Sequence, residues 1–138
     1  MPSIFSRIIR REIPCHEIYR DDRVIAFLDI APVSKGHAIV VPTEEGDFLH
    51  QLSDESAAAV GRVLPRVARA ILAATGATSY NILQNNGKPA HQAVPHVHFH
   101  VIPKHADGSG LGIQWNAGQL SSHEGATLAS MIREQVGR

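Results

Sequence analysis

Short apolar runs separated by turn-forming residues recur along the chain, and runs of this length are typical of strands. One run stops at Pro42 and the last stops at Pro103, where a missing backbone N–H is expected to end strand pairing. The predicted strands are 24–28, 37–41, 80–84 and 96–102.

A long alanine-rich stretch at 53–74 has the length and pattern of the main helix. Ser53 is the expected N-cap, acidic residues follow it in the first turn, and Gly76 lies just past the end. Pro65 lies inside this stretch and lacks the N–H of a helical hydrogen bond, so it predicts a kink or a division into two helices.

Weaker helical patterns lie near both ends, at 5–11 and at 121–136. Strands that come first as a cluster and are then separated by one long helix are typical of α+β proteins. The pattern therefore predicts an α+β fold with a mainly antiparallel sheet. A length of 138 residues, with no repeat or linker, predicts one domain.

The composition narrows the class of partner. Thirteen basic residues balance thirteen acidic ones without forming blocks, so neither nucleic acid nor a membrane surface is an expected partner. No apolar run is long enough to span a membrane, and the N-terminus lacks the pattern of a secretion signal. Cys15 is the single cysteine and cannot form an internal disulfide, so we expect a cytoplasmic protein.

Three of the nine histidines, His96, His98 and His100, occupy alternate positions of the last predicted strand. Side chains alternate between the two faces of a strand, so these three are expected to share one face. Three adjacent imidazoles add little stability, because each must find partners for both ring nitrogens or lose hydration. The shared face therefore indicates chemistry.

Metal binding is one explanation, because neutral imidazole is a good zinc ligand. On a straight strand, however, the Cα atoms of His96 and His100 would lie about 13 Å apart, whereas Zn–N bonds are about 2.0 to 2.1 Å. Two neighbours can chelate an ion and all three cannot. Asp107 is the only nearby carboxylate downstream. We therefore expect neither a metal nor another cofactor.

Nucleophilic catalysis uses the alternation better, because a neutral imidazole can attack phosphorus while its neighbours fix its tautomer and stabilise charged oxygens. His98 has an imidazole on each side and is the predicted nucleophile. The sequence has no Gly-x-Ser-x-Gly elbow, and Cys15 has no local activating motif. The expected chemistry is transfer of a phosphorus-containing group.

The segment 96–102 resembles the signature of the histidine triad (HIT) family, His-φ-His-φ-His-φ-φ with φ apolar, at every position. The resemblance runs from about residue 4 to residue 113, and it is closest to the nucleoside phosphoramidase and nucleotide-binding branch, including its bacterial members. It implies a single HIT-like domain over 1–138 with a tail from about residue 114. It also implies a five-stranded sheet, one long helix, short terminal helices and a homodimer.

The same resemblance implies residue roles. His98 would be the nucleophile, and His96 and His100 would orient it and contact phosphate, supported by His37. Asp29 would bind the ribose hydroxyls, and the polar contacts near the phosphate and leaving group would come from Asn85 and Gln92. The base pocket would be walled by Phe5, Ile18, Phe27 and Leu28. Asp29 and Asn85 also suit turns, and the four apolar residues also suit a plain core.

Two departures from the family pattern affect these expectations. Many relatives bind a structural zinc through a cysteine pair near the N-terminus, where this chain has Ser3 and Ser6, so that zinc is not expected. Ala93 stands where several relatives have a Ser or Thr that helps the leaving group, and His91 stands where glycine is frequent. Differences in rate or substrate preference are expected there.

The sequence thus predicts a hydrolase or transferase that acts on phosphoramidates or related esters of purine nucleoside monophosphates through a covalent nucleotidyl-histidine intermediate. The alternatives are a dinucleoside polyphosphate hydrolase, a nucleotide-binding adaptor with negligible turnover, and an imidazole-ligated metalloprotein. Formation of product from an adenosine phosphoramidate separates the enzymes from the adaptor.

Overall fold

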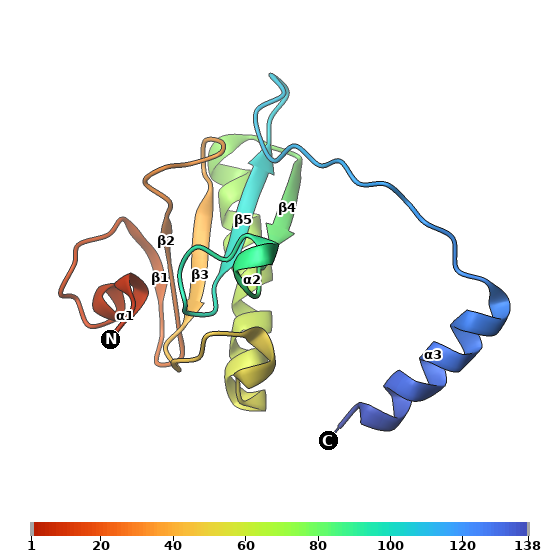
Figure 1. Cartoon of the computed structure of the whole chain (residues 1–138). Coiled ribbons are helices and arrows are strands. Elements are labelled where there is room, and N and C mark those ends of the chain that lie inside the picture. The colour runs from red at the N-terminus through yellow and green to blue at the C-terminus, as the bar shows by residue number, and fades with distance from the viewer. Residues whose placement is uncertain (1, 138) are drawn as a thin grey trace.

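The computed structural model describes residues 2–137. It is an α+β fold in which one five-stranded sheet carries a long helix, as predicted (Figure 1). The sheet has the order β1-β2-β3-β5-β4, and every neighbouring pair is antiparallel. The elements are α1 (Ile4–Ile9), β1 (Glu17–Arg20), β2 (Val24–Leu28), β3 (Ala38–Pro42), the 3₁₀-helix η1 (Leu49–Gln51), α2 (Asp54–Thr75), β4 (Ser79–Leu83), the 3₁₀-helix η2 (Lys88–Ala90), β5 (Phe99–Lys104) and α3 (Ser122–Gln135).

The long helix α2 begins and ends where the sequence predicts. The Ser53 side chain accepts a hydrogen bond from the Ser56 backbone N–H at 3.1 Å, and Gly76 adopts the left-handed conformation that ends the helix. The helix is not divided at Pro65, so the alternative of two helices is wrong. Its apolar stripe from Ala59 to Ile71 packs against the sheet on both sides of Pro65, and this tertiary contact outweighs one missing hydrogen bond.

Two apolar clusters lie on opposite faces of the sheet because side chains alternate along β2 and β3. On one face, Val24, Ala26, Ala38 and Val40 pack against α2. On the other face, Ile25, Phe27, Ile39 and Val41 pack against Phe5 and Ile8 of α1. The second face is the one that also carries the site described below.

The strand boundaries correct three predictions. β3 spans Ala38–Pro42 rather than 37–41, and Pro42 still pairs with Val24. β5 begins at Phe99 rather than at residue 96, so His96 and His98 precede the strand. β5 also continues through Pro103, which is tolerated because β3 pairs with β5 only up to Val101. The first strand, β1, was not among the apolar runs because its sequence holds a single aliphatic residue, Ile18, and its outer edge is unpaired.

After β5 the chain extends away from the sheet and ends in α3, which lies apart from the sheet and α2 (Figure 1). Ser121 caps this helix by accepting a hydrogen bond from the Glu124 N–H at 3.1 Å. All residues of α3 are described and none is buried, so its apolar stripe of Leu128, Met131 and Ile132 is exposed. Among residues 2–137, no helix is both long and apolar enough to cross a membrane.

Gly36 fixes the turn that leads to His37. Its φ of +93° is a left-handed conformation, and an added Cβ would lie 2.9 Å from Thr75 Cγ2. We expect Gly36→Ala to lower the free energy of unfolding by about 1 to 3 kcal/mol. Gly61 in α2 is the matched control, because an added Cβ meets nothing within 4 Å, and Gly61→Ala should be stabilising. Equal effects in urea unfolding would contradict this account.

Candidate active site

A cavity of about 320 Å³ opens on the face of the sheet that α1 partly covers. Apolar side chains dominate its wall, and its polar groups come from Asp29, His91, His98 and His100. A mostly apolar cavity with a few convergent polar groups is typical of a small-molecule site. Of the residues predicted to wall a base pocket, Phe5, Phe27 and Leu28 line the cavity and Ile18 does not.

His98 lies in this cavity with its tautomer fixed by the backbone. Its Nδ1 lies 2.7 Å from the carbonyl oxygen of His96, and a carbonyl only accepts, so Nδ1 carries the proton. In the neutral ring, Nε2 then has a free lone pair. Burial is the main cause that lowers the pKa of His98, which keeps the ring neutral near pH 7. The remaining nitrogen is therefore available as a nucleophile.

His100 is held by a second chain of hydrogen bonds. The backbone N–H of Val33 donates to His37 Nδ1 at 3.0 Å, so the proton of neutral His37 lies on Nε2. His37 Nε2 lies 2.8 Å from His100 Nδ1 and donates to it. The proton of His100 is therefore on Nε2. Burial lowers the pKa of both rings, which supports these neutral forms, and His100 offers the cavity a hydrogen-bond donor.

Asp29 follows β2 and places its carboxylate at the edge of the same cavity. Its Oδ1 accepts from the Ala31 N–H at 2.8 Å, and its Oδ2 lies 3.6 Å from His37 Nε2. Its side chain is 19% exposed, so a ligand can still reach it. The Asp29 carboxylate therefore stabilises the turn after β2 and also remains accessible from the cavity.

Asp29, His37 and His100 also form a cluster whose ligand atoms lie within 4.8 Å of one another. A metal ion there would have to replace the hydrogen bond between the two imidazoles, because that bond uses the nitrogens that face each other. The arrangement as it stands is that of a hydrogen-bonded relay. The absence of a metal stays a prediction.

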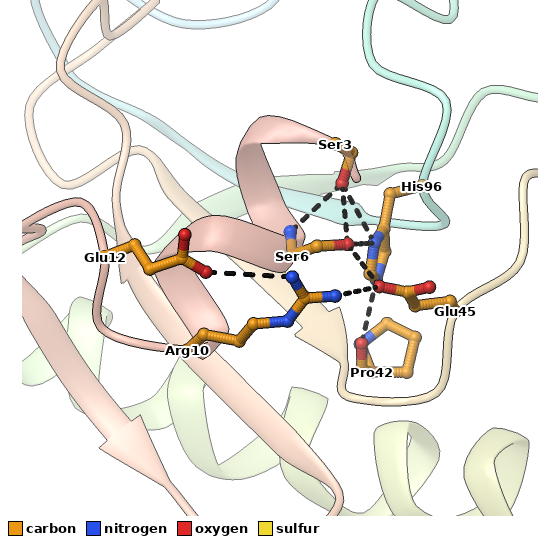
Figure 2. A network of polar contacts seen from close by, with 7 residues as sticks. All are labelled: Ser3, Ser6, Arg10, Glu12, Pro42, Glu45 and His96. Atoms are coloured by element: carbon orange, nitrogen blue, oxygen red, sulfur yellow. Dashed lines mark hydrogen bonds and ion pairs between the residues drawn. The ribbon is translucent and has the colours of Figure 1, made fainter. Parts of the chain in front are cut away.

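His96 does not share the cavity with the other two histidines. It is 1% exposed, and its ring nitrogens contact the Pro42 carbonyl and the hydroxyls of Ser3 and Ser6 (Figure 2). The expectation that all three rings share one face is wrong at this position, because strand alternation applies only from Phe99 onward. His96 contributes its backbone carbonyl to the site.

Asn85 and Gln92 brace the loop before the triad and do not line the cavity. Asn85 Nδ2 donates to the His91 carbonyl at 3.3 Å. Gln92 accepts from the Gly87 N–H at 2.7 Å and donates to the carbonyls of Asp47 and Val94. Both side-chain amides thus form hydrogen bonds with the backbone. Their predicted contacts with the phosphate or the leaving group are not supported by these positions and stay predictions.

Several residues of the cavity wall had no predicted contact with the substrate, Ile39 and His91 among them. Ile39 lines the cavity, and the alternation along β3 could have placed it on the same face as Phe27. His91 lines it with a left-handed backbone, φ 71°, which is costly for a residue other than glycine. The frequent glycine at this position in relatives is the sequence signal that could have predicted a positive φ.

Comparison with known proteins agrees with this geometry. The family model for the HIT domain matches residues 10–107. An adenosine 5'-monophosphoramidase of Schizosaccharomyces pombe is 44% identical over 136 residues, which cover 99% of this chain and 99% of that protein. An adenylylsulfatase of Arabidopsis thaliana is 39% identical over 139 residues, covering 96% of this chain and 68% of that protein.

The fold matches as well. The crystal structure of a member of the HIT family from Bacillus subtilis superposes with a TM-score of 0.94 at 34% identity, covering 100% of this chain and 99% of that one. The matched family region contains Asp29, His37, His98 and His100. The family resemblance read from the sequence is therefore confirmed, and the chain belongs to the HIT family.

Proposed function

We propose that the protein hydrolyses phosphoramidates of purine nucleoside monophosphates, with His98 as the nucleophile. The observation that carries the proposal is the single tautomer of His98, whose Nδ1–H is bound by the His96 carbonyl while Nε2 is left for the cavity. The name of the similar Schizosaccharomyces pombe protein, adenosine 5'-monophosphoramidase, supports the substrate class.

The reaction proceeds in two displacements. His98 Nε2 attacks phosphorus, a P–N bond to the histidine forms, and the P–N bond to the leaving amine breaks with its electron pair going to the amine. The amine takes a proton from solvent, and the attack of water in the second displacement returns one. Water then attacks the same phosphorus, and the nucleoside monophosphate leaves as the imidazole is restored. His100 Nε2–H donates to a phosphate oxygen as negative charge develops there.

Substrate binding divides between the polar and apolar parts of the cavity. Phe27 and Leu28 give the base an apolar wall, and Asp29 accepts hydrogen bonds from the ribose hydroxyls. This arrangement requires a base and a sugar on the phosphorus that His98 attacks. Nucleoside monophosphate derivatives satisfy that requirement.

Replacing Asp29 with alanine is expected to weaken ribonucleotide binding by about 1.5 to 3 kcal/mol, because hydrogen bonds to a charged acceptor are lost. Deoxyribonucleotides should lose less. Isothermal titration with AMP and with 2',3'-dideoxy-AMP measures both effects on the same protein. Equal losses for the two sugars would remove the ribose assignment.

Hydrolysis of adenosine 5'-phosphoramidate tests the function directly. We expect release of AMP and ammonia with saturable kinetics, and a parallel assay with a dinucleoside polyphosphate should give slower turnover. Tight AMP binding without turnover of either substrate would instead favour the nucleotide-binding adaptor. Faster cleavage of the polyphosphate would favour the dinucleoside polyphosphate hydrolase.

A cytoplasmic location remains a prediction.

The proposed assembly is a homodimer. β4 lies at one edge of the sheet, and its Tyr80 and Ile82 side chains are more than two-fifths exposed. An exposed edge strand can pair with its symmetry mate. Light scattering at tens of micromolar should give twice the mass of one chain, and Ile82→Lys should lower it. A monomeric mass for the unaltered protein would contradict the proposal.

A further inference from the structure

A partly buried polar cluster, whose carboxylate lies at the surface, joins the start of α1 to the loop after β3. It consists of Ser3, Ser6, Glu45 and His96, and its contacts are drawn in Figure 2. His96 and Ser6 are almost completely buried. The cluster is formed by three segments far apart in the sequence.

The hydrogen bonds of the cluster can be assigned a direction. The Pro42 carbonyl only accepts, so His96 Nε2, at 3.0 Å, donates to it, and in the neutral ring Nδ1 is then an acceptor. Ser3 Oγ lies 3.2 Å from Nδ1 and donates to it. The Ser6 hydroxyl donates a hydrogen bond to Glu45 Oε1 at 2.7 Å. Both nitrogens of the His96 ring are thereby satisfied.

The donor set does not fit the structural zinc that many relatives bind at this position, in agreement with the expectation from the sequence. Zinc in structural sites takes thiolates, imidazoles and carboxylates, and Ser3 and Ser6 offer neutral hydroxyls where many relatives have cysteines. His96 Nδ1 and the Glu45 carboxylate are the good ligands that remain, and each already has a hydrogen-bond partner. Hydrogen bonds within the protein thus satisfy the polar groups of the cluster that could otherwise bind zinc.

The cluster is coupled to the nucleophile through His96. The ring bonds of His96 hold the residue whose carbonyl accepts from His98 Nδ1 at 2.7 Å. Phe5, between the two serines, packs edge-on against the His98 ring with centroids 4.8 Å apart. The Val97 N–H donates to the Gly46 carbonyl at 2.9 Å, which fixes the backbone between the two histidines.

We propose that Ser3, Ser6 and Glu45 are positioning residues that stand in place of a metal and, through His96, hold His98 in its Nδ1–H tautomer. The inference rests on the proposed role of His98 as nucleophile. A displaced His96 carbonyl would release the His98 proton to either nitrogen, and molecules protonated at Nε2 cannot attack phosphorus. Ser3, Ser6 and Glu45 therefore determine the fraction of molecules in which His98 is protonated at Nδ1 and can attack phosphorus.

The test compares Ser3→Ala, which removes the donor to His96 Nδ1, and Ser6→Ala and Glu45→Gln, which remove the contact beside it, with the unaltered protein. Ser121→Ala, which removes an N-cap hydroxyl from the distant helix α3, is the control. For Ser6→Ala and Glu45→Gln we expect kcat to fall about tenfold with little change in KM, because the nucleophile is misplaced while the base and ribose contacts remain. Ser3→Ala is expected to show the same loss of kcat and the same mixture of His98 tautomers as the other two variants. Ser6→Thr keeps the hydroxyl and should recover most of the rate. Ser121→Ala should change neither constant.

Nitrogen-15 NMR of the histidine rings reports the His98 tautomer without any substrate. The unaltered protein should show His98 protonated at Nδ1, and Ser6→Ala and Glu45→Gln should show a mixture of tautomers. A pure Nδ1–H signal in both variants, or loss of melting temperature with no change in kcat, would overturn the positioning role. Stoichiometric zinc in the purified protein would overturn the metal-free assignment. Because the NMR signal needs no turnover, these outcomes are separable from failure of the proposed activity.

Discussion

His98→Ala is expected to reduce kcat for adenosine 5'-phosphoramidate by about 10⁴-fold or more, because the substitution removes the atom that forms the covalent bond. AMP should still bind with an affinity close to that of the unaltered protein, since Phe27, Leu28 and Asp29 remain. Steady-state kinetics and titration with AMP measure the two quantities separately.

His123→Ala is the matched control for this experiment, because His123 lies in α3, exposed and away from the cavity. His123→Ala should leave both kcat and the affinity for AMP unchanged. Strong turnover by His98→Ala would return the three histidines to a metal-binding or structural role, whereas loss of AMP binding together with turnover would indicate a collapsed site.

The second large effect is expected at His100. His100→Ala removes the Nε2–H donor to the phosphate oxygens, and loss of one such donor costs about 10²- to 10³-fold in kcat. It also removes the acceptor for His37 Nε2–H, which keeps only the 3.6 Å approach of Asp29. We therefore expect a lower melting temperature in addition to a lower rate.

A double-mutant cycle with His37→Ala separates the two consequences. If His37 acts by fixing the tautomer of His100, His37→Ala should add little to the loss already caused by His100→Ala. Fully additive losses in kcat would mean that His37 acts independently of His100, which contradicts the relay deduced from the Val33, His37 and His100 hydrogen bonds.

The sequence predicts α2 and the strand Val24–Leu28 because both depend on residues within the element itself. Ser53, the alanine-rich run and Gly76 predict α2 because capping and apolar periodicity act within one helix. The strand Val24–Leu28 is likewise fixed by its own apolar residues. The choice of His98 as nucleophile stays a prediction, and the expectation that it has an imidazole on each side is wrong at His96, which does not line the cavity. The roles of His37 and Asp29 come from the wider family resemblance and are predictions as well.

Long-range contacts decide what the sequence could not predict. His96 turns away from the cavity because the Ser3 hydroxyl and the Pro42 carbonyl, both distant in sequence, form hydrogen bonds with its ring. Gln92 has the residue type of a substrate contact, but backbone groups of its own loop and of Asp47 use its amide. Partners of this kind appear only once the chain is folded.

The central claim is that His98 becomes covalently bonded to the nucleotide. Mixing the unaltered enzyme with a labelled adenosine phosphoramidate, quenching within one turnover and sequencing the labelled peptide tests it most directly. We expect AMP attached to the peptide that contains His98, through a bond that is labile in acid and stable in base, and no such adduct in His98→Ala. Turnover at full rate with no labelled peptide at any quench time would mean that water attacks the substrate directly, and it would contradict the account.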